Sequence, residues 1–402
     1  MADINLQARK TELMRAIDKL KPELTKMSDY IFDHPEVGYR EVEASRLLAG
    51  FLRSNGFEVS PGYGGLATAF RAVCQNGSGG PCIGLLCEYD AVLNLGHVCA
   101  HHLQGPSIAG AAVALKDIMR DFPYTLEVIG TPAEETAEGG KNVMLANGAF
   151  TQLDIALMMH GGDATQTDVK SMALSEFVVT FNGISSHSAV APDKGRSALE
   201  ALMLAFNGIA YLRGHVRDDV RIHGIIENGG QAVNAIPEAA AARIEVRSYD
   251  RPYLDEVIAR VLRILEGAAL MTDTNYEVKR VADMHNKIPV RSLNRLLMEN
   301  AETAGAKAIA PPREKTGSTD FASVMYHVPG SCIRVPFIEK GTTAHSRAWL
   351  DRGKAPEAYE AIILGAKILA LTAADLIQDG NLLAGIIDEF HREKAAICSQ
   401  IS

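Results

Sequence analysis

The amino-acid sequence predicts an α/β fold with a mostly parallel sheet, into which a smaller α+β domain is inserted. Four short apolar segments are typical of buried strands, and helical patterns lie between several of them. This alternation favours a parallel sheet covered on both faces. Partway along the chain the pattern changes to half-exposed strands and amphipathic helices, which predicts the insert.

Length and composition limit the classes of protein to consider. The chain has 402 residues, 47% of them hydrophobic and 22% charged, which is typical of a globular protein long enough for two domains. A net charge of −9 argues against nucleic acid as a partner. No apolar stretch is long enough for a membrane span, and the charged N-terminal segment lacks the core of a signal peptide. Cysteines without disulfide spacing predict a cytoplasmic protein: Cys74, Cys82, Cys87, Cys99, Cys332 and Cys398.

The elements of the larger domain follow from periodicity. Residues 10–55 predict two helices broken at 34–38, the second of them over Glu41–Asn55 before Gly56. The segment 62–67 superficially fits a dinucleotide fingerprint, but a strand pattern follows it, so we expect a loop. Buried strands are expected at Cys82–Cys87, Leu126–Ile129, Ile155–Met159 and Cys332–Val335, and helices at Ile108–Arg120 and Lys141–Asn147.

The insert has its own order of elements. Strand, helix, strand, strand, helix and strand patterns occupy Phe177–Asn182, Ser197–Leu212, Arg221–Glu227, Ala241–Tyr249, Tyr253–Met271 and Tyr276–Val281. This β-α-β-β-α-β order predicts a ferredoxin-like domain. We therefore expect the insert at residues 171–284 and the larger domain at 1–170 and 285–402.

Polar side chains follow the apolar strands where each strand is expected to end. Glu88 and Asp90 follow the first, the Glu134-Glu135 pair the second, His160 the third, and His345 lies in the loop after the fourth. Ligands of open α/β sheets bind outside the carboxyl ends of the strands. Strand polarity thus predicts that these clusters converge.

The residue types in these clusters suit a metal centre. Cys99 and His101 lie two positions apart just before a helix, and they join the Glu134-Glu135 pair, His160 and His345 as donors. Thiolate, imidazole and carboxylate together favour zinc or a neighbouring transition metal. Five protein ligands are too many for one catalytic ion and fit two ions that share a bridge. Adjacent glutamates can divide the work, one binding metal and the other taking a proton.

With these motifs the sequence resembles the M20 metallopeptidase family, in the amidohydrolase branch of aminoacylase-1-like and aminobenzoyl-glutamate hydrolase-like proteins. The resemblance covers nearly the whole chain. It is carried by these segments in order: His34-Pro35-Glu36-Val37-Gly38-Tyr39, Glu88-Tyr89-Asp90-Ala91, residues 96–101, Thr131-Pro132-Ala133-Glu134-Glu135, Met159-His160-Gly161, Gly183-Ile184-Ser185-Ser186-His187, Asn234-Ala235-Ile236-Pro237, Gly317-Ser318-Thr319-Asp320-Phe321 and Ala344-His345-Ser346.

The resemblance implies a metallo-aminopeptidase-like catalytic domain with two divalent ions, zinc or manganese, and a lid domain that forms a homodimer. It makes Cys99 the bridging ligand and Glu134 the general base. Asp90 would orient a ligating histidine. The remaining implied ligands are His101, Glu135, His160 and His345, and on the insert His187 would stabilise the oxyanion while Asn234 and Arg247 hold the substrate.

Three positions depart from the pattern of this family. Ala100 stands where glycine is usual, and His102 where Asp or Asn is usual. His102 could be a benign replacement, an extra ligand or a sign of altered chemistry. Glu88 stands where other branches carry a ligand histidine, and it could equally line the pocket.

The function predicted is metal-dependent hydrolysis of the amide bond in a small N-acyl amino acid or dipeptide-like substrate. One alternative keeps the scaffold and runs amide-bond formation, acyl transfer or another metal-assisted step. A non-catalytic metal-binding or ligand-binding protein is a third, against which the retention of both Glu134 and Glu135 argues. Serine hydrolysis has no candidate nucleophile, because the nucleophile motif Gly-x-Ser-x-Gly does not occur.

Overall fold

The computed structural model describes residues 2–399, and these form two compact units. The first contains the chain up to Lys170 together with Lys287–Ala395, and the second contains Ser171–Asn286 and the described residues from Ala396 on. Of the six cysteines, Cys398 has a side chain outside the described part, and the other five are free thiols. Among the described residues, no helix is long and apolar enough to cross a bilayer.

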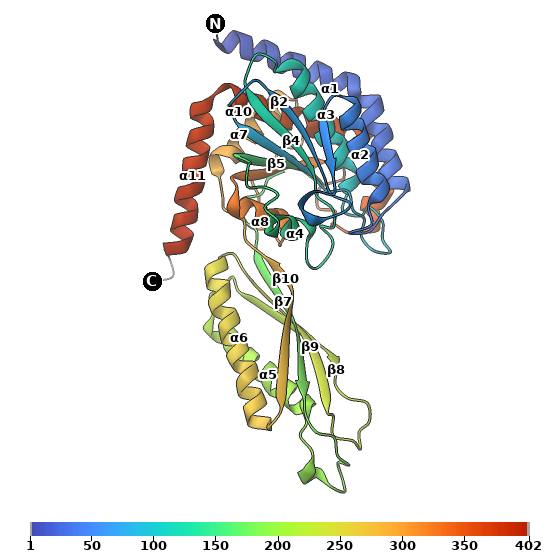
Figure 1. The fold of residues 1–402 in the computed structure, drawn as a ribbon, viewed down its shortest axis with the longest axis vertical. Helices are drawn as coiled ribbons and strands as arrows, with labels where there is room; N and C mark the ends of the chain where they lie inside the picture. The colour runs from blue at the N-terminus through green and yellow to red at the C-terminus, as the bar shows by residue number, and fades with distance from the viewer. Residues whose placement is uncertain (1, 400–402) are drawn as a thin grey trace. The chain divides into compact units, whose positions relative to one another are not determined.

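The first unit is built on a seven-stranded sheet in the order β1-β2-β4-β3-β5-β11-β6 (Figure 1). Its inner strands β4, β3, β5 and β11 run parallel, and β1, β2 and β6 are antiparallel additions at the edges. The bounds are β1 Glu58–Pro61, β2 Phe70–Asn76, β3 Cys82–Cys87, β4 Tyr124–Gly130, β5 Ile155–Gly162, β6 Gln166–Thr167 and β11 Gly330–Pro336. The mostly parallel sheet predicted from the apolar runs is confirmed.

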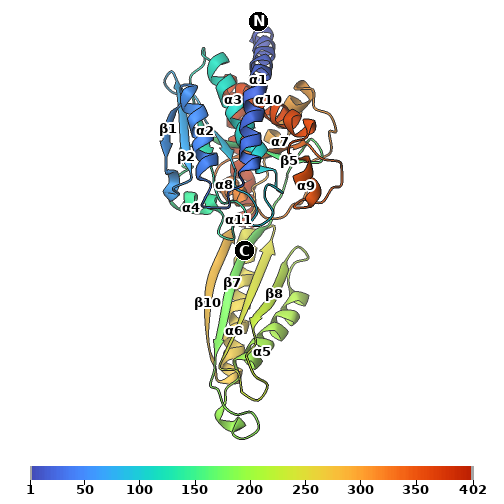
Figure 2. The same cartoon turned by 90° about the vertical axis from the view of Figure 1, so that its right-hand side faces the viewer.

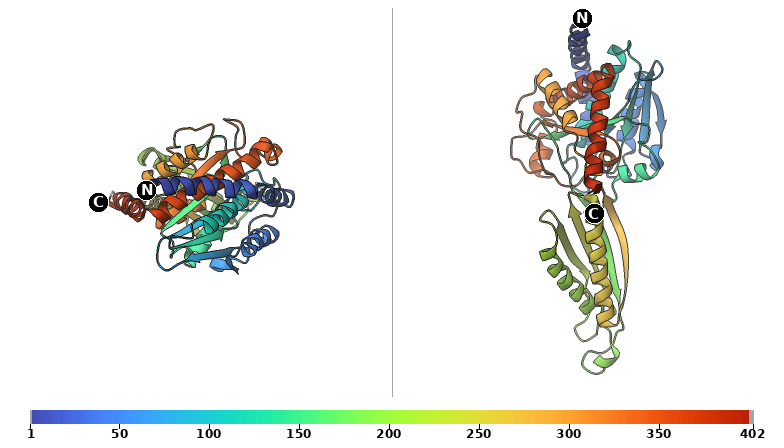
Figure 3. Two further views of the ribbon diagram at one scale, coloured as in Figure 1. Left: turned by 90° about the horizontal axis from the view of Figure 1, so that it is seen from above. Right: turned by 90° about the vertical axis from the view of Figure 1, so that its left-hand side faces the viewer.

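Long helices cover this sheet. Helix α3 (Gln104–Ile118) is rich in Ala and Gly and is buried almost all round, because it contacts strands on one side and α1 (Ala2–Asp33) and α10 (Pro356–Gln378) on the other. Figure 3 shows α1 lying along the top of this layer. Helix α2 (Val42–Ser54) buries Ala44, Leu48 and Phe51, much as its periodicity predicts, and packs on α3 and β2.

The remaining helices of this unit are short or lie towards its C-terminal end. They are α4 Gly140–Ala146, α7 Arg291–Thr303, α8 Asp320–His327, α9 Arg347–Arg352 and α11 Gly380–Ser399, with 3₁₀ turns η1 at Tyr63–Gly65 and η2 at His101–Leu103. Turn η1 takes up the segment 62–67, which is therefore a loop before strand β2, as expected. Helices α4 and α8 contact each other although they are far apart in the sequence.

One strand is longer than its apolar run predicts. Strand β5 does not end at Met159 but continues to Gly162, so His160 lies within the strand rather than after it. The extension pairs with β11, where Arg334 is the register partner of His160 and Pro336 that of Gly162. Pairing with a neighbour thus overrides the weak strand preference of His and Gly.

The second unit is an antiparallel sheet in the order β10-β7-β9-β8 with two helices (Figure 2). Along the chain its elements are β7 Ala173–Asn182, α5 Ala198–Leu212, β8 Arg221–Asn228, β9 Ala239–Ser248, α6 Arg251–Thr272 and β10 Asn275–Met284, with 3₁₀ turns at Pro192–Lys194 and Arg213–His215. This is the β-α-β-β-α-β order that the sequence predicts. Side chains of Ser197 and Asp250 cap the two helices by accepting the backbone N–H groups of Glu200 and Tyr253.

The two faces of this sheet differ in burial, because buried and half-exposed residues alternate along β9. On β9, Ala240, Ala242, Ile244 and Val246 are buried in a core that includes residues of α5 and α6, whereas the odd-numbered residues between them are half-exposed. Strand β8 forms one edge of the sheet, and seven of its eight residues are exposed. A long exposed edge strand offers unpaired backbone groups to another strand.

Candidate metal centre

The candidate ligands are positioned by the carboxyl ends of the parallel strands. Asp90 follows β3, Glu134 and Glu135 follow β4, His160 lies near the end of β5, and His345 lies in the loop between β11 and α9. Cys99 and His101 belong to the loop after β3 that leads through η2 into α3. The convergence that strand polarity predicts is therefore visible in the geometry of the first unit.

Two groups of potential ligand atoms share Cys99. One consists of Cys99, His101 and His160, and the other of Cys99, Glu135 and His345; within each group all ligand atoms lie within 4.8 Å of one another. The Cys99 sulfur is 3.5 Å from His160 Nε2, and His345 Nε2 is 3.5 Å from Glu135 Oε1. This arrangement suits two ions with the thiolate between them.

The histidines are held so that one ring nitrogen faces the cluster. His101 Nδ1 lies 3.0 Å from Asp90 Oδ1, and His160 Nδ1 lies 2.7 Å from the Gly161 carbonyl oxygen. Both contacts favour a proton on Nδ1 and leave the Nε2 lone pair for a metal. At His160 the contact with the Gly161 carbonyl at 2.7 Å is shorter than that with the Arg334 guanidinium, 3.2 Å from the same nitrogen. The other carboxylate oxygen of Asp90 accepts the backbone N–H of Glu135 at 2.8 Å, so Asp90 links two of the ligand loops.

The protonation equilibria reflect the same clustering of charge. Burial tends to raise the pKa of Glu135, but a hydrogen bond from His345 and the charge of His101 outweigh burial and lower it to about 2. Hydrogen bonds to Cys99 and Glu135 raise the pKa of His345 to about 10. A divalent cation at this pocket would have to displace that proton, because a histidine binds metal through its neutral ring.

Two buried polar atoms in the centre make no hydrogen bond of good geometry among the described residues. They are His101 Nε2 and Glu135 Oε1, whose nearest oppositely charged atoms are Glu88 Oε2 at 3.3 Å and His345 Nε2 at 3.5 Å. Buried polar atoms are normally satisfied, so such a pair calls for a ligand. An imidazole nitrogen, a carboxylate oxygen and a nearby thiol are donors that zinc and its neighbours accept. The donor set therefore fits divalent metal.

Glu134 sits on a tight turn after β4. Ala133 adopts a left-handed conformation with φ of 64°, and its N–H donates to the buried Glu41 carboxylate at 2.7 Å. Gly140 N–H donates to the Ala133 carbonyl at 3.0 Å, and a side chain on Gly140 would clash with the Pro132 carbonyl. Burial, followed by the charges of Glu88 and Asp320, raises the pKa of Glu134 well above its usual value.

A buried ion cluster lies next to Glu134. The Lys141 ammonium, which is fully buried, donates to Glu88 Oε1 and to Asp320 Oδ1, both at 2.6 Å. Glu88 also accepts Gln104 Nε2 at 2.7 Å, and its Oε2 lies 3.3 Å from His101 Nε2. Carboxylate oxygens of Glu88, Glu134 and Asp320 all lie within 4.8 Å of one another. Glu88 thus borders the candidate ligands and is tied to a lysine.

The sequence pattern does not single out two residues of this cluster, Lys141 and Asp320. Asp320 belongs to a segment of the family resemblance, but that segment assigns it no role. Lys141 lies in the first turn of α4, where a positive charge opposes the helix dipole. That mismatch is the signal that could have drawn attention to it.

Arg334 is a further residue that the sequence pattern does not single out. Its Nη1 lies 3.2 Å from His160 Nδ1, and its Nε donates to Asp168 at 3.2 Å.

Two of the departures from the family pattern have structural explanations. Ala100 has a φ of 63°, a left-handed conformation in which glycine is favoured, and its methyl group is accommodated against Gly161. His102 Nε2 lies 2.9 Å from the Gly353 carbonyl, and its buried ring packs on Phe32. His102 joins none of the potential ligand groups among the described residues, which favours the benign interpretation.

Three predicted site residues lie on the second unit. His187 and Asn234 are exposed loop residues, and the backbones of His187 and Ala235 form an isolated antiparallel bridge. Arg247 is on the half-exposed face of β9, where its Nε and Nη2 donate to Glu245 at 2.6 and 2.8 Å. Glu245, which lies two residues before Arg247 on the same strand, therefore pairs with this guanidinium.

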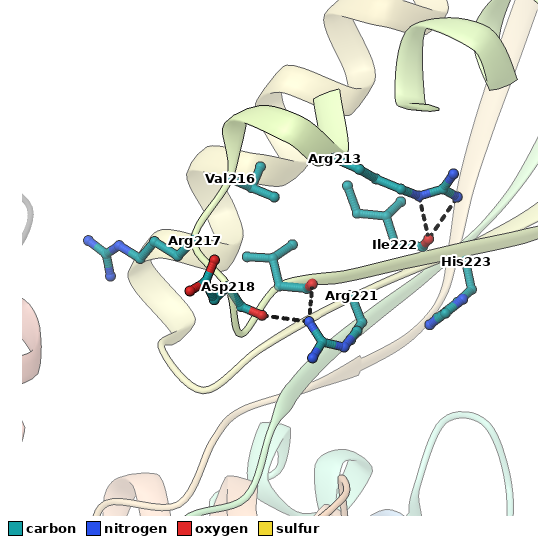
Figure 4. Close-up of a pocket in the computed structure, with 8 residues that line it drawn as sticks. Arg213, Val216, Arg217, Asp218, Arg221, Ile222 and His223 are labelled. Atoms are coloured by element: carbon teal, nitrogen blue, oxygen red, sulfur yellow. Dashed lines mark hydrogen bonds between the residues drawn. The ribbon is translucent and has the colours of Figure 1, made fainter. Parts of the chain in front are cut away.

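A pocket of about 550 Å³ on the second unit is lined by arginines (Figure 4). Arg213 donates through Nε and Nη2 to the Ile222 carbonyl, and Arg221 Nη1 donates to the carbonyls of Asp218 and Val220. These guanidinium groups hold the turn before β8. The pocket is therefore explained by local backbone support.

Comparison with known proteins places this geometry in a family context. The sequence pattern of peptidase family M20/M25/M40 matches residues 96–373. The human Xaa-Arg dipeptidase is 33% identical over 96% of this chain and 92% of its own length. One of the polypeptides of p-aminobenzoyl-glutamate hydrolase from Escherichia coli strain K12 is 28% identical, over 92% of each chain.

A solved structure shares the fold. It is a dinuclear metal-binding peptidase of the M20 family from Bacillus subtilis, with a TM-score of 0.69 and 19% identity over 90% of this chain and 99% of that one. This likeness confirms the fold class predicted from the sequence.

Proposed function

The chain belongs to peptidase family M20/M25/M40, and on that premise we propose that it hydrolyses the amide bond of a small N-acyl amino acid or dipeptide. Family membership confirms the resemblance and the hydrolase class predicted from the sequence. The observation that carries the proposal is the sharing of Cys99 by two ligand groups beside Glu134. The comparisons offer no support for amide-bond formation or acyl transfer.

The proposed centre holds two divalent ions, zinc or manganese. Cys99 would be shared by both ions, and His101, Glu135, His160 and His345 would complete the ligand set. Bound ions would polarise the substrate carbonyl and make the attacking water more acidic. Asp90 supports this set by fixing the His101 ring and the Glu135 backbone.

Glu134 acts as the general base in this proposal. It accepts a proton from the water as the oxygen attacks the carbonyl carbon, and it donates that proton to the nitrogen as the C–N bond breaks. A raised pKa makes the Glu134 carboxylate a stronger base than an ordinary one, which suits acceptance of a proton from water. His187 stabilises the oxyanion, in its own subunit or in a partner's, and Asn234 and Arg247 hold the substrate.

Replacing Cys99 with alanine should reduce the metal content from two ions per chain to at most one. The bridging sulfur would contribute to both ions, so its loss weakens both. Metal per chain is measured by mass spectrometry after reconstitution with zinc or manganese. Cys74→Ala, at a half-buried cysteine of β2, is the control and should keep both ions. Unchanged content in Cys99→Ala would sink the two-ion proposal.

Glu134→Gln should lower kcat by about 10²–10⁴-fold while metal content and fold are retained. The amide keeps the shape of the side chain but cannot accept the proton of water. Turnover is measured with a panel of N-acyl amino acids and dipeptides. Glu138→Gln, at an exposed glutamate of the same loop, should leave turnover unchanged. Activity of Glu134→Gln within a few-fold of the parent would assign the base role elsewhere.

Arg247 is proposed to bind the substrate carboxylate. Lysine lacks the bidentate fork of arginine, so both Arg247→Lys and Arg247→Ala should weaken acidic substrates far more than their methyl esters. The ratio of kcat/KM for acid and ester measures this. Arg243→Lys is the matched control on the same face of β9, where Arg243 pairs with Glu176 and Glu227. Equal losses for acid and ester would make Arg247 structural.

We also propose that the protein works in the cytoplasm.

A second copy of the chain is the proposed partner, and the second unit forms this homodimer through its edge strand β8. Ile225 and Ile226 of β8 are 62% and 48% exposed, which is unusual for isoleucine on a free surface. Light scattering should show a dimer at micromolar concentration and a monomer for Ile225→Lys, because an edge lysine blocks strand pairing. Leu93→Lys, at an exposed leucine of the first unit, is the control. A monomeric parent protein contradicts the proposal.

A further inference from the structure

Lys141 is a buried cation for which the proposed mechanism has no role. Its ammonium has no exposure to water and is held by Glu88 and Asp320 at 2.6 Å each. Its own backbone N–H donates to the second Asp320 oxygen at 3.0 Å, so side chain and main chain grip the same carboxylate. Bringing a lysine fully into the interior is expensive, and lysine is almost never buried without partners. The desolvation cost of burying Lys141 suggests that this residue has a function.

The local backbone is shaped to bring this lysine close to the base. Gly139 has a φ of 71°, and a side chain there would meet the Asp320 Cβ at 2.7 Å. A side chain on Gly140 would lie 1.8 Å from the Pro132 carbonyl oxygen. Only two glycines in succession let the first turn of α4 reach both Asp320 and the turn that carries Glu134. The helix dipole opposes a cation at this position, so the carboxylates must supply the compensation.

The carboxylate that Lys141 holds is itself a potential ligand. Glu88 Oε2 lies 3.3 Å from His101 Nε2, the nitrogen that faces the proposed metal centre. Its other oxygen, Oε1, is the one bound by Lys141. A glutamate this close could turn towards a metal on His101 and add an oxygen ligand. Gln104 and Lys141 are the two side chains that hold it in place.

We propose that Lys141 is a positioning residue whose ammonium restrains Glu88 and thereby keeps this carboxylate out of the metal coordination sphere. The open coordination position next to Glu134 then remains available for water and substrate. Glu88 serves as the counter-charge of a lysine instead of acting as a sixth ligand. This inference rests on the proposed metal centre. The experiment below distinguishes a failure of the metal centre from a failure of the role proposed for Lys141.

The experiment uses the Co²⁺-loaded full-length protein, because the visible d–d absorption of cobalt weakens as its coordination number rises. The parent protein should show a thiolate-to-cobalt charge-transfer absorption from Cys99. The absence of this absorption would contradict the proposed metal centre. Lys141→Met keeps the length of the side chain and removes its charge. It should show weaker d–d absorption than the parent and a kcat at least tenfold lower with a smaller change in KM.

Two controls separate this role from ordinary packing. Lys141→Arg keeps the charge and should keep the parent spectrum. Lys10→Met removes a lysine from another largely buried pair, with Asp375, and should leave the spectrum unchanged. In the double variant Lys141→Met/Glu88→Gln, the neutral amide is a poor ligand, so the parent spectrum should return. A spectrum and kcat of Lys141→Met equal to those of the parent would overturn the proposal.

Folding supplies a second readout. If Lys141→Met does not fold, the double variant Lys141→Met/Glu88→Gln decides the question, since it removes both members of the pair. Recovery of folded protein, measured by circular dichroism and thermal unfolding, supports a role exerted through Glu88. A double variant that also fails to fold overturns the proposal, because Lys141 would then be needed for packing whatever the charge of Glu88.

Discussion

The candidate site depends on the compensation of charge at the end of a buried parallel sheet. Glu88, Asp90 and His101 are almost completely withdrawn from water. A buried ion without a partner costs several kcal/mol, so each of these groups must be paired. Asp90 contacts the His101 ring and the Glu135 backbone, and Glu88 contacts Lys141 and Gln104. Because these bonds are directional, the pairing that neutralises the site also fixes the positions of its side chains.

Backbone strain collects at the same place. Of the seven non-glycine residues with positive φ among those described, Ala100, Ala133 and His345 carry or adjoin proposed ligands and the base. A left-handed conformation costs an ordinary residue about 1–2 kcal/mol, and it persists only where the surroundings enforce it. At Ala133 the enforcing groups are the Glu41 carboxylate and the Gly140 N–H. These left-handed residues therefore lie in or beside the loops that carry the proposed ligands and base.

The sequence predicts the strands, their polarity and most of the converging clusters, because burial and alternation are local patterns. It does not predict the partners of buried charges. Lys141 and Asp320 are 179 positions apart, and only the packing of α4 against α8 brings them together. The apolar run also misplaces the end of β5, because pairing with β11 is a property of the assembled sheet. What the sequence does contain is the mismatch itself: a lysine in the first turn of a helix, next to two glycines.

The two units bear ionic interactions that differ in burial, as Lys141 and Arg247 illustrate. In the first unit Lys141 is inaccessible and doubly paired, so removing one partner would strand a buried charge at a cost of about 3–5 kcal/mol. In the second unit the Arg247 and Glu245 side chains remain 30% and 21% exposed, and pairs of this kind contribute about 0–1 kcal/mol. The Arg247–Glu245 pair therefore contributes little to stability, which is compatible with the proposed role of Arg247 in binding a substrate carboxylate. If the proposed roles hold, substitutions at Arg247 change substrate preference, whereas substitutions at Lys141 change the metal centre.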